Sequence, residues 1–413
     1  GLGRGSTTWP VDTIADEIDW SEHFDVPVGL VTGTNGKTTT VRLTQHILRA
    51  AELNVGLSST DWIGVNDEII DRGDYSGPGG ARTVLRQKQV DVAVLETARG
   101  GLLRRGLGVP RADAALITNI AEDHLGDFGS QNLQELLDLK WIVMKALDKN
   151  SIAILNADDP LLTAKAAELD IPICWFSLDP AHPLLQHHRK NAGSATTVID
   201  DQVARFDGAA WHPLCAVNDI PVTLDGSARH NIANALAAVA LSHALGADDP
   251  AIARGLQSMQ ADDNPGRCNF FRVRGCDVLL DFAHNPSAMQ AIFDIARTHP
   301  ARRRLLCFGQ AGDRTDELIL ELAANAWAIG LEHVMISELA GYRRGREAGE
   351  VFKLLRTGLI QAGAHSEQIS HHTLERESLD HALNIARPGD LVIMLALADS
   401  KGILEYLKSI DGT

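Results

Sequence analysis

Short runs of apolar residues alternate with amphipathic segments over most of the chain. Each run is about as long as a buried strand and is rich in Val, Ile and Leu, which favours strand over helix. The runs lie at residues 26–33, 90–97, 112–120, 151–160 and 171–178. The segment at residues 37–53 instead repeats its apolar residues with helical spacing. This alternation predicts an α/β protein built on a doubly wound parallel sheet.

The pattern changes between residues 179 and 227, where shorter apolar runs are separated by turn residues. Such a pattern is typical of antiparallel strands, and it predicts a small antiparallel side sheet. An alanine-rich helix is expected at residues 230–246. Beyond residues 265–269, which contain Pro and Gly, strand and helix signals alternate again. We therefore predict an N-terminal extension (1–26), a central domain (27–268) and a Rossmann-like C-terminal domain (269–413).

Composition narrows the class of protein. A chain of 413 residues is too long for one ordinary core, so two or three domains are expected. The net charge of −16 makes nucleic acid or an anionic membrane an unexpected partner. The five cysteines are scattered and contain no CxxC pair, so we expect small buried side chains in a protein of the reducing cytoplasm.

Residues 33–39, GTNGKTT, stand between the first predicted strand and the first predicted helix. The consensus phosphate loop is GxxxxGK[ST], and this shorter version keeps its end. Small residues let backbone N–H groups face phosphates at a helix N-terminus, and the Lys and Thr side chains can reach the phosphates and Mg²⁺. The motif therefore predicts a nucleotide site on Gly33, Thr34, Asn35, Gly36, Lys37, Thr38 and Thr39.

Two further polar residues stand at the ends of predicted strands. Glu96 ends one apolar run, and His124 lies just beyond another. Neighbouring strand ends converge beside the phosphate loop in a doubly wound sheet, where a carboxylate and an imidazole can hold a divalent ion. Taken alone, His124 would be a helix-cap or surface histidine. Together with the loop, the pattern predicts two metal positions: a first Mg²⁺ on Thr38, and a second divalent ion on Glu96 and His124.

A series of motifs follows the phosphate loop in a fixed order: a strand-end Glu, TNIAEDHL, AILNADDP, HNIANALAA, NPGR and DFAHNP. This series resembles the Mur ligases, which join an amino acid to a carboxylate at the expense of ATP. The segments LETARGGLLRRGLG, STDWIGV, GDYSGP and GYRRGREAGE are more similar to the C-terminal, Mur-ligase-like half of the cyanophycin synthetases. The resemblance runs from residue 27 to residue 413.

The resemblance implies which residues do the chemistry. Glu96 and His124 would bind a second Mg²⁺. Lys140 matches a lysine that many Mur ligases carbamoylate, although a helix-surface lysine is the alternative. A carbamate carries the negative charge that a metal site needs, which an arginine could not provide. The implied catalytic set is Lys37, Glu96, His124, Lys140 and His284.

The same resemblance implies contacts to nucleotide and substrate. Asn231, and with it His230, matches a motif that contacts adenine, Arg267 an arginine that contacts the phosphates, and Asp281 an aspartate that contacts ribose. Four charged residues would contact the substrates, and for each of them a solvated position at the surface is the alternative. They are Arg99, Asp313, Arg314 and Arg346.

The implied reaction is amide-bond formation through an acyl phosphate, with ATP and Mg²⁺ as cofactors. The substrates would be a small-molecule or peptide carboxylate and an amino-acid amine donor, for example arginine joined to an aspartyl side chain. A UDP-muramoyl substrate is not expected, because only about 26 residues precede the first strand. Two alternatives stay open: a folylpolyglutamate-synthase-like ligase and a non-catalytic ATP-binding partner subunit. Whether the chain forms a homo-oligomer is also open.

Overall fold

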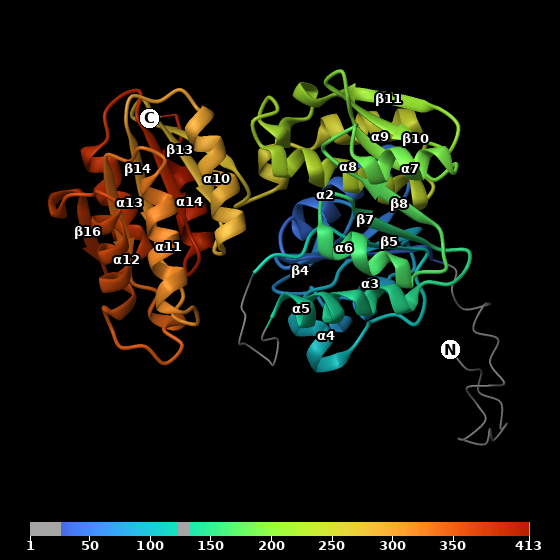
Figure 1. Cartoon of the computed structure of the whole chain (residues 1–413), viewed down its shortest axis with the longest axis horizontal. Coiled ribbons are helices and arrows are strands. Elements are labelled where there is room, and N and C mark those ends of the chain that lie inside the picture. Colours follow the sequence, from blue (N-terminus) through green and yellow to red (C-terminus); the bar gives the residue numbers. More distant parts are fainter. Residues whose placement is uncertain (1–25, 123–131, 413) are drawn as a thin grey trace.

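The computed structural model describes residues 26–122 and 132–412. In this part of the chain the strands form an 11-stranded and a 6-stranded sheet, and Figure 1 shows the two sheets side by side. All strands of the larger sheet lie before residue 217, and all strands of the smaller one begin at residue 269 or later. No helix in these ranges combines the length and the apolar character needed to cross a bilayer.

The larger sheet has a parallel centre with an antiparallel hairpin at each edge. The parallel strands, in spatial order, are β9 (Ala195–Ile199), β8 (Ile173–Phe176), β7 (Ile152–Asn156), β6 (Ala114–Ile117), β1 (Val28–Thr32), β5 (Val92–Glu96) and β2 (Val55–Ser58). One edge is extended by β10 (Gln202–Phe206) and β11 (Trp211–Ala216), and the other by β3 (Trp62–Val65) and β4 (Glu68–Arg72). β1 thus lies between β6 and β5, so the phosphate loop leaves the middle of the sheet.

Helices cover both faces of the larger sheet. One face carries α2 (Lys37–Ala50), α8 (Arg229–Ala244) and α9 (Asp249–Ser258). The other carries α3 (Pro78–Leu85), α5 (Leu133–Lys140), α6 (Pro160–Lys165) and α7 (Pro183–Lys190), with α4 (Arg99–Arg105) against α3 and α5. Gly255 of α9 lets α2 approach closely, because a Cβ there would stand 2.2 Å from the Cα of Ile47.

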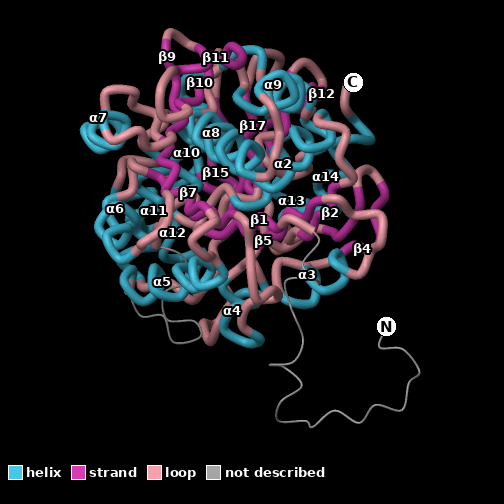
Figure 2. The backbone as a smooth tube through the Cα atoms, turned by 90° about the vertical axis from the view of Figure 1, so that its right-hand side faces the viewer, coloured by secondary structure: helices cyan, strands magenta, loops and turns pink. Residues whose placement is uncertain are grey.

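The smaller sheet is parallel except for its first strand. Its spatial order is β12 (Asn269–Val273), β13 (Cys276–Asp281), β17 (Leu391–Leu395), β14 (Arg304–Phe308), β15 (His333–Ser337) and β16 (Ile369–His372), and β12 is antiparallel to β13. One face packs on α10 (Pro286–Thr298), α11 (Asp316–Trp327) and α12 (Glu350–Gln361), the other on α13 (Glu375–Ile385) and α14 (Ser400–Ile410). Figure 2 shows the whole chain turned by 90°, with helices, strands and loops in different colours.

The predicted α/β fold is confirmed, and so are the strands expected from the apolar runs. The expected side sheet is not separate, since β9 pairs in parallel with β8 and its hairpin partners continue the larger sheet. The open edge of β8 explains this, because its backbone groups need hydrogen-bond partners. The hairpin β3–β4 was not expected. β4 is exposed along its whole length, so it has no apolar alternation to reveal it.

Candidate active site

The phosphate loop connects β1 to α2 and depends on two glycines. The φ angle is +144° at Gly33 and +86° at Gly36. A Cβ at Gly33 would stand 1.9 Å from Oγ1 of Thr118, and one at Gly36 would stand 2.2 Å from Oδ1 of Asn234. No side chain caps the start of α2. The N–H groups of its first turn are therefore available to an anion, as the motif predicts.

Two lysines lie against this loop. Nζ of Lys37 donates to the carbonyl oxygens of Gly33 at 3.1 Å and Thr34 at 2.8 Å. Nζ of Lys140, at the end of α5, donates to the same Gly33 oxygen at 2.7 Å, and its residue is 4 % exposed. Lys140 is therefore not a surface lysine. Its carbamoylation stays a prediction.

Glu96 lies in direct contact with the start of α2. The Thr38 hydroxyl donates to its carboxylate at 3.1 Å, and Thr60 donates to it through both its hydroxyl, at 2.7 Å, and its backbone N–H, at 3.1 Å. Glu96 is 1 % exposed as a residue. A hydroxyl and a carboxylate beside a phosphate loop are the oxygen ligands that Mg²⁺ prefers, so this donor set fits the ion.

His124 lies outside the residues that the structure describes. Within those residues, no group of three or more His, Cys, Asp or Glu side chains could hold a metal ion. Of the predicted metal ligands, the structure therefore describes Thr38 and Glu96. Metal binding by His124 stays a prediction.

The smaller sheet contributes a second set of polar groups. Asp281 ends β13, is 7 % exposed, and accepts hydrogen bonds from the backbone N–H groups of Cys268 at 2.8 Å and Ala283 at 2.7 Å. The Arg267 guanidinium lies 4.9 Å from the ring centre of Phe282. Arg267 lies in the connection between the two sheets, and Asp281 lies at the end of β13.

The start of α8 supplies the residues predicted to contact adenine. Asn231 is buried, and its amide donates to the carbonyl of Val222 at 2.8 Å and accepts from Asn234 at 3.0 Å. Burial lowers the pKa of His230 although the nearby Asp281 opposes the shift, so the ring is neutral at pH 7. Nε2 of His230 lies 3.5 Å from Sγ of Cys268. His230 thus presents a flat, uncharged surface beside Asn231.

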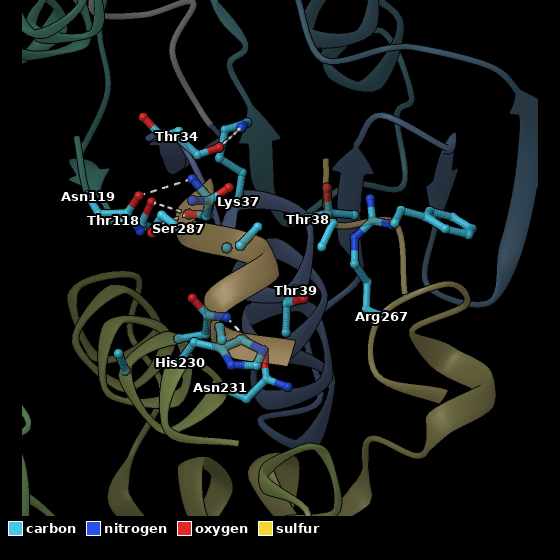
Figure 3. A pocket seen from close by; sticks show the side chains of 18 of the residues that line it. Thr34, Lys37, Thr38, Thr39, Thr118, Asn119, His230, Asn231, Arg267 and Ser287 are labelled. Atoms are coloured by element: carbon cyan, nitrogen blue, oxygen red, sulfur yellow. Dashed lines mark hydrogen bonds between the residues drawn. The ribbon is translucent and has the colours of Figure 1, made fainter. Parts of the chain in front are cut away.

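These groups surround one cavity of about 460 Å³ between the two sheets. Figure 3 shows Lys37 and Thr38, Arg267, and the pair His230 and Asn231 on different sides of it. The cavity brings together most of the predicted catalytic and nucleotide-binding residues. They are Thr34, Asn35, Gly36, Lys37, Thr38, Thr39, Glu96, Asn231, Arg267, Asp281 and His284.

The residues predicted to contact substrate do not line this cavity. Arg99 is the first residue of α4, and Asp313 stands beside Arg314 in the loop after β14. Arg314 donates to the carbonyl of His284 at 3.1 Å. Arg346 donates to the carbonyl of Arg314 at 2.7 Å and pairs with Asp316 and Glu350. Arg346 therefore braces the loop that holds Arg314 beside the cavity, and its contact with substrate stays a prediction.

Sequence reasoning missed two contacts that hold this site together, although the resemblance implies that Asn285, beside His284, lies near the reaction centre. Thr60 orients Glu96, and only its place in the segment STDWIGV singled it out. Asn285, the N-cap of α10, exchanges hydrogen bonds with Asn35 of the phosphate loop: the Asn285 amide donates at 2.8 Å and the Asn35 amide donates at 3.3 Å. This pair joins residues 250 positions apart, so no local signal could have found it.

Comparison with curated proteins finds relatives along almost the whole chain. The cyanophycin synthetase of Synechocystis sp. is 35 % identical over 388 residues, which cover 93 % of this chain and 44 % of that protein. The chain thus spans less than half the length of this relative.

Solved structures share the fold at low sequence identity. E. coli FolC in complex with DHPP and ADP has a TM-score of 0.67 at 20 % identity, covering 93 % of this chain and 89 % of that one. A bifunctional folylpolyglutamate synthase/dihydrofolate synthase with Mn, AMPPNP and L-glutamate bound has a TM-score of 0.66 at 20 % identity, covering 92 % and 89 %.

Two family models match in succession. The Mur ligase middle domain matches residues 31–242, and the Mur ligase, glutamate ligase domain matches residues 266–396. The first match contains the phosphate loop and Glu96, and the second contains Arg267 and Asp281. Because the two models together account for most of the described chain, this protein belongs to the Mur ligase family.

Proposed function

We propose that the chain is an ATP-dependent carboxylate–amine ligase that works through an acyl phosphate. The observation that carries the proposal is the cavity between the sheets. It is lined by a phosphate loop with a Thr38–Glu96 contact, and by Arg267 and Asp281. The folylpolyglutamate synthase/dihydrofolate synthase of the same fold has Mn and AMPPNP bound. A carboxylate and an amine do not condense at neutral pH, so a phosphorylated carboxylate would supply the missing leaving group.

The chain's own groups have separate parts in this proposal. Lys37 and the first-turn N–H groups of α2 would bind the phosphates. Thr38 and Glu96 would hold Mg²⁺, with His124 as a further ligand, and the ion would neutralise charge on the transferring phosphoryl group. Arg267 would also contact the phosphates, Asp281 would contact the ribose and Asn231 the adenine. Glu96 and Asp281 are nearly fully buried, so few water molecules can compete with ligands for their carboxylates.

We further propose two domains, 27–268 and 269–413, with the nucleotide bound by the first and the amine donor by the second. An amino acid such as arginine joined to an aspartyl side chain is the proposed reaction, by similarity to the cyanophycin synthetases. Arg314, held against His284 at the edge of the cavity, is the proposed contact for the carboxylate of the donor.

Phosphate release, screened over amino acids with aspartyl and β-aspartyl-arginine peptides as acceptors, tests the proposal. Lys37→Ala should reduce turnover by at least about a hundredfold, because the variant loses a charge that stabilises the phosphoryl group. Lys401→Ala is a matched control, since this lysine makes an exposed contact with Glu405 at 3.8 Å.

An unchanged rate in Lys37→Ala would refute the phosphate-loop assignment. No phosphate release with any acceptor or donor, while ATP still binds, would refute the ligase in favour of a non-catalytic ATP-binding subunit.

A further inference from the structure

Arg42 is a fully buried arginine on α2, one turn beyond Thr38. It is 1 % exposed, although arginine is rarely buried unless it is paired. Burial lowers its pKa to about 10, and the partly compensating Asp61 carboxylate lies 2.5 Å away. The guanidinium is therefore still charged at neutral pH. A charge in this position must be held by specific contacts, and they connect two parts of the site.

One end of the guanidinium fixes the turn that carries Thr60. Nη2 of Arg42 pairs with Asp61, and its central carbon lies 4.0 Å from the ring centre of Trp62. The turn is closed by the backbone N–H of Ser59, which donates to the carbonyl of Trp62 at 3.0 Å. Arg42 thus holds the residues on the C-terminal side of Thr60, whose hydroxyl and N–H orient the Glu96 carboxylate.

The other end of the guanidinium reaches the connection between the two sheets. Nη1 of Arg42 donates to Oδ1 of Asn264 at 3.0 Å, and the Asn264 amide donates to the Thr39 hydroxyl at 3.2 Å. Asn264 is 1 % exposed. Its carbonyl accepts from the backbone N–H of Arg267 at 3.2 Å. The same guanidinium therefore holds the residue that places Arg267 at the cavity.

We propose that Arg42 is a positioning residue that fixes Glu96 and Arg267 relative to each other. It does not line the cavity, so it acts only through Thr60 and Asn264. The inference rests on the proposed function, because Glu96 and Arg267 matter only if the cavity binds a metal–nucleotide complex. The planar fork of arginine is required, since a lysine keeps the charge but reaches one of the two partners at a time.

The first test is amide hydrogen exchange without nucleotide. In Arg42→Lys, exchange at residues 59–62 and at residues 264–269 should accelerate together, because both segments lose the same contact. The matched control is Arg49→Lys, on the same helix. Arg49 pairs with Asp67 on the surface, where the two side chains are 31 % and 79 % exposed. The Arg49→Lys variant should leave the exchange rates of both segments unchanged.

The second test is the metal dependence of the site. Arg42→Lys, Asp61→Asn and Thr60→Val should each raise the Mg²⁺ concentration for half-maximal turnover about tenfold, which is the effect of about 1.4 kcal/mol on an oriented ligand. Arg49→Lys should match the wild type. Mn²⁺ binding in the presence of AMPPNP should weaken in the same variants, so the result does not depend on finding the right substrates.

Combining Arg42→Lys with Thr60→Val should add little to either change, since both act on Glu96 through one turn. Independent, multiplying effects would overturn the proposal. So would an Arg42→Lys protein that melts earlier but keeps wild-type exchange at residues 59–62 and wild-type Mn²⁺ binding. Asp61→Asn serves if Arg42→Lys does not fold, because the Asp61 side chain is 28 % exposed.

If the wild-type protein binds Mn²⁺ and AMPPNP but turns over no substrate, the proposed ligase function is contradicted. The positioning role of Arg42 can still be tested by amide exchange and Mn²⁺ binding. Wild-type exchange and wild-type Mn²⁺ binding in all three variants contradict the positioning role whatever the reaction is.

Discussion

Two buried glutamates, one beside each sheet, show how differently a carboxylate can be held. Glu96 at the end of β5 and Glu375 at the start of α13 are 1 % and 3 % exposed. Glu375 accepts backbone N–H groups, from Leu397, Ala398 and Asp399, at 2.6–3.1 Å. Glu96 accepts two threonine hydroxyls and one N–H, and it lines the cavity.

The difference teaches that burial alone does not identify a functional carboxylate. Backbone amides are fixed donors, so the Glu375 carboxylate is committed to joining α13 to the segment after β17. Hydroxyls can rotate, and they can accept as well as donate. The Glu96 carboxylate can therefore exchange a hydroxyl partner for a metal ion without leaving a backbone group unpaired.

The largest expected effect is at Glu96. Glu96→Gln should reduce turnover about a thousandfold, equivalent to about 4 kcal/mol, because the metal site loses its anionic ligand. The melting temperature should change little, since the amide oxygen still accepts from Thr60. Steady-state kinetics and calorimetry measure the two quantities. Turnover within tenfold of the wild type would remove Glu96 from the metal site and break the comparison.

Glu375→Gln should give the opposite result. The amide nitrogen cannot accept, so some of the three N–H groups lose their acceptor, and we expect about 2 kcal/mol lower stability. Turnover per folded molecule at 20 °C should stay within about twofold of the wild type. The exposed Glu405→Gln is the control. If Glu375→Gln removed activity and left stability intact, Glu375 would have a functional role as Glu96 does, and the contrast between the two glutamates would be wrong.

The smallest expected effect concerns the pH dependence of stability at Asp390, a third buried carboxylate. Burial alone would raise its pKa, but the Arg303 guanidinium and the N–H of Arg387 outweigh burial and hold the pKa below its usual range. Its stabilisation is therefore complete above the ordinary aspartate pKa of about 3.9, and it is lost as pH falls below that value.

Asp390→Asn should accordingly be less stable than the wild type at pH 7, and the difference should shrink as pH falls from 5 to 3. Urea unfolding at a series of pH values measures it. If the difference in stability stayed constant over this range, the charge of the Asp390 carboxylate would contribute nothing to stability. The comparison of buried carboxylates would then rest on Glu96 and Glu375 alone.

Much of the fold was predictable, because its signals are local. A pattern of only a few residues was enough to predict each of three features: the apolar run before Gly33, the glycines of the phosphate loop and the strand that ends at Glu96. The predicted cavity residues also came together, although their roles are still predictions. The contacts that hold them did not follow from the sequence. Thr60 and Asn264 are joined to the site only by pairing across the fold, and the edge strand β4 is too exposed to show a pattern.

The exchange of hydrogen bonds between Asn35 and Asn285 has a consequence for motion. Oδ1 of Asn285 accepts from Asn35 at 3.3 Å and from the backbone N–H of Ala288 at 2.9 Å, so one atom serves the phosphate loop and the cap of α10. Separating the two sheets would break both side-chain hydrogen bonds between Asn35 and Asn285. Oδ1 of Asn285 would then lose the hydrogen bond from Asn35. Separation of the two sheets at this point therefore requires both hydrogen bonds between Asn35 and Asn285 to break together.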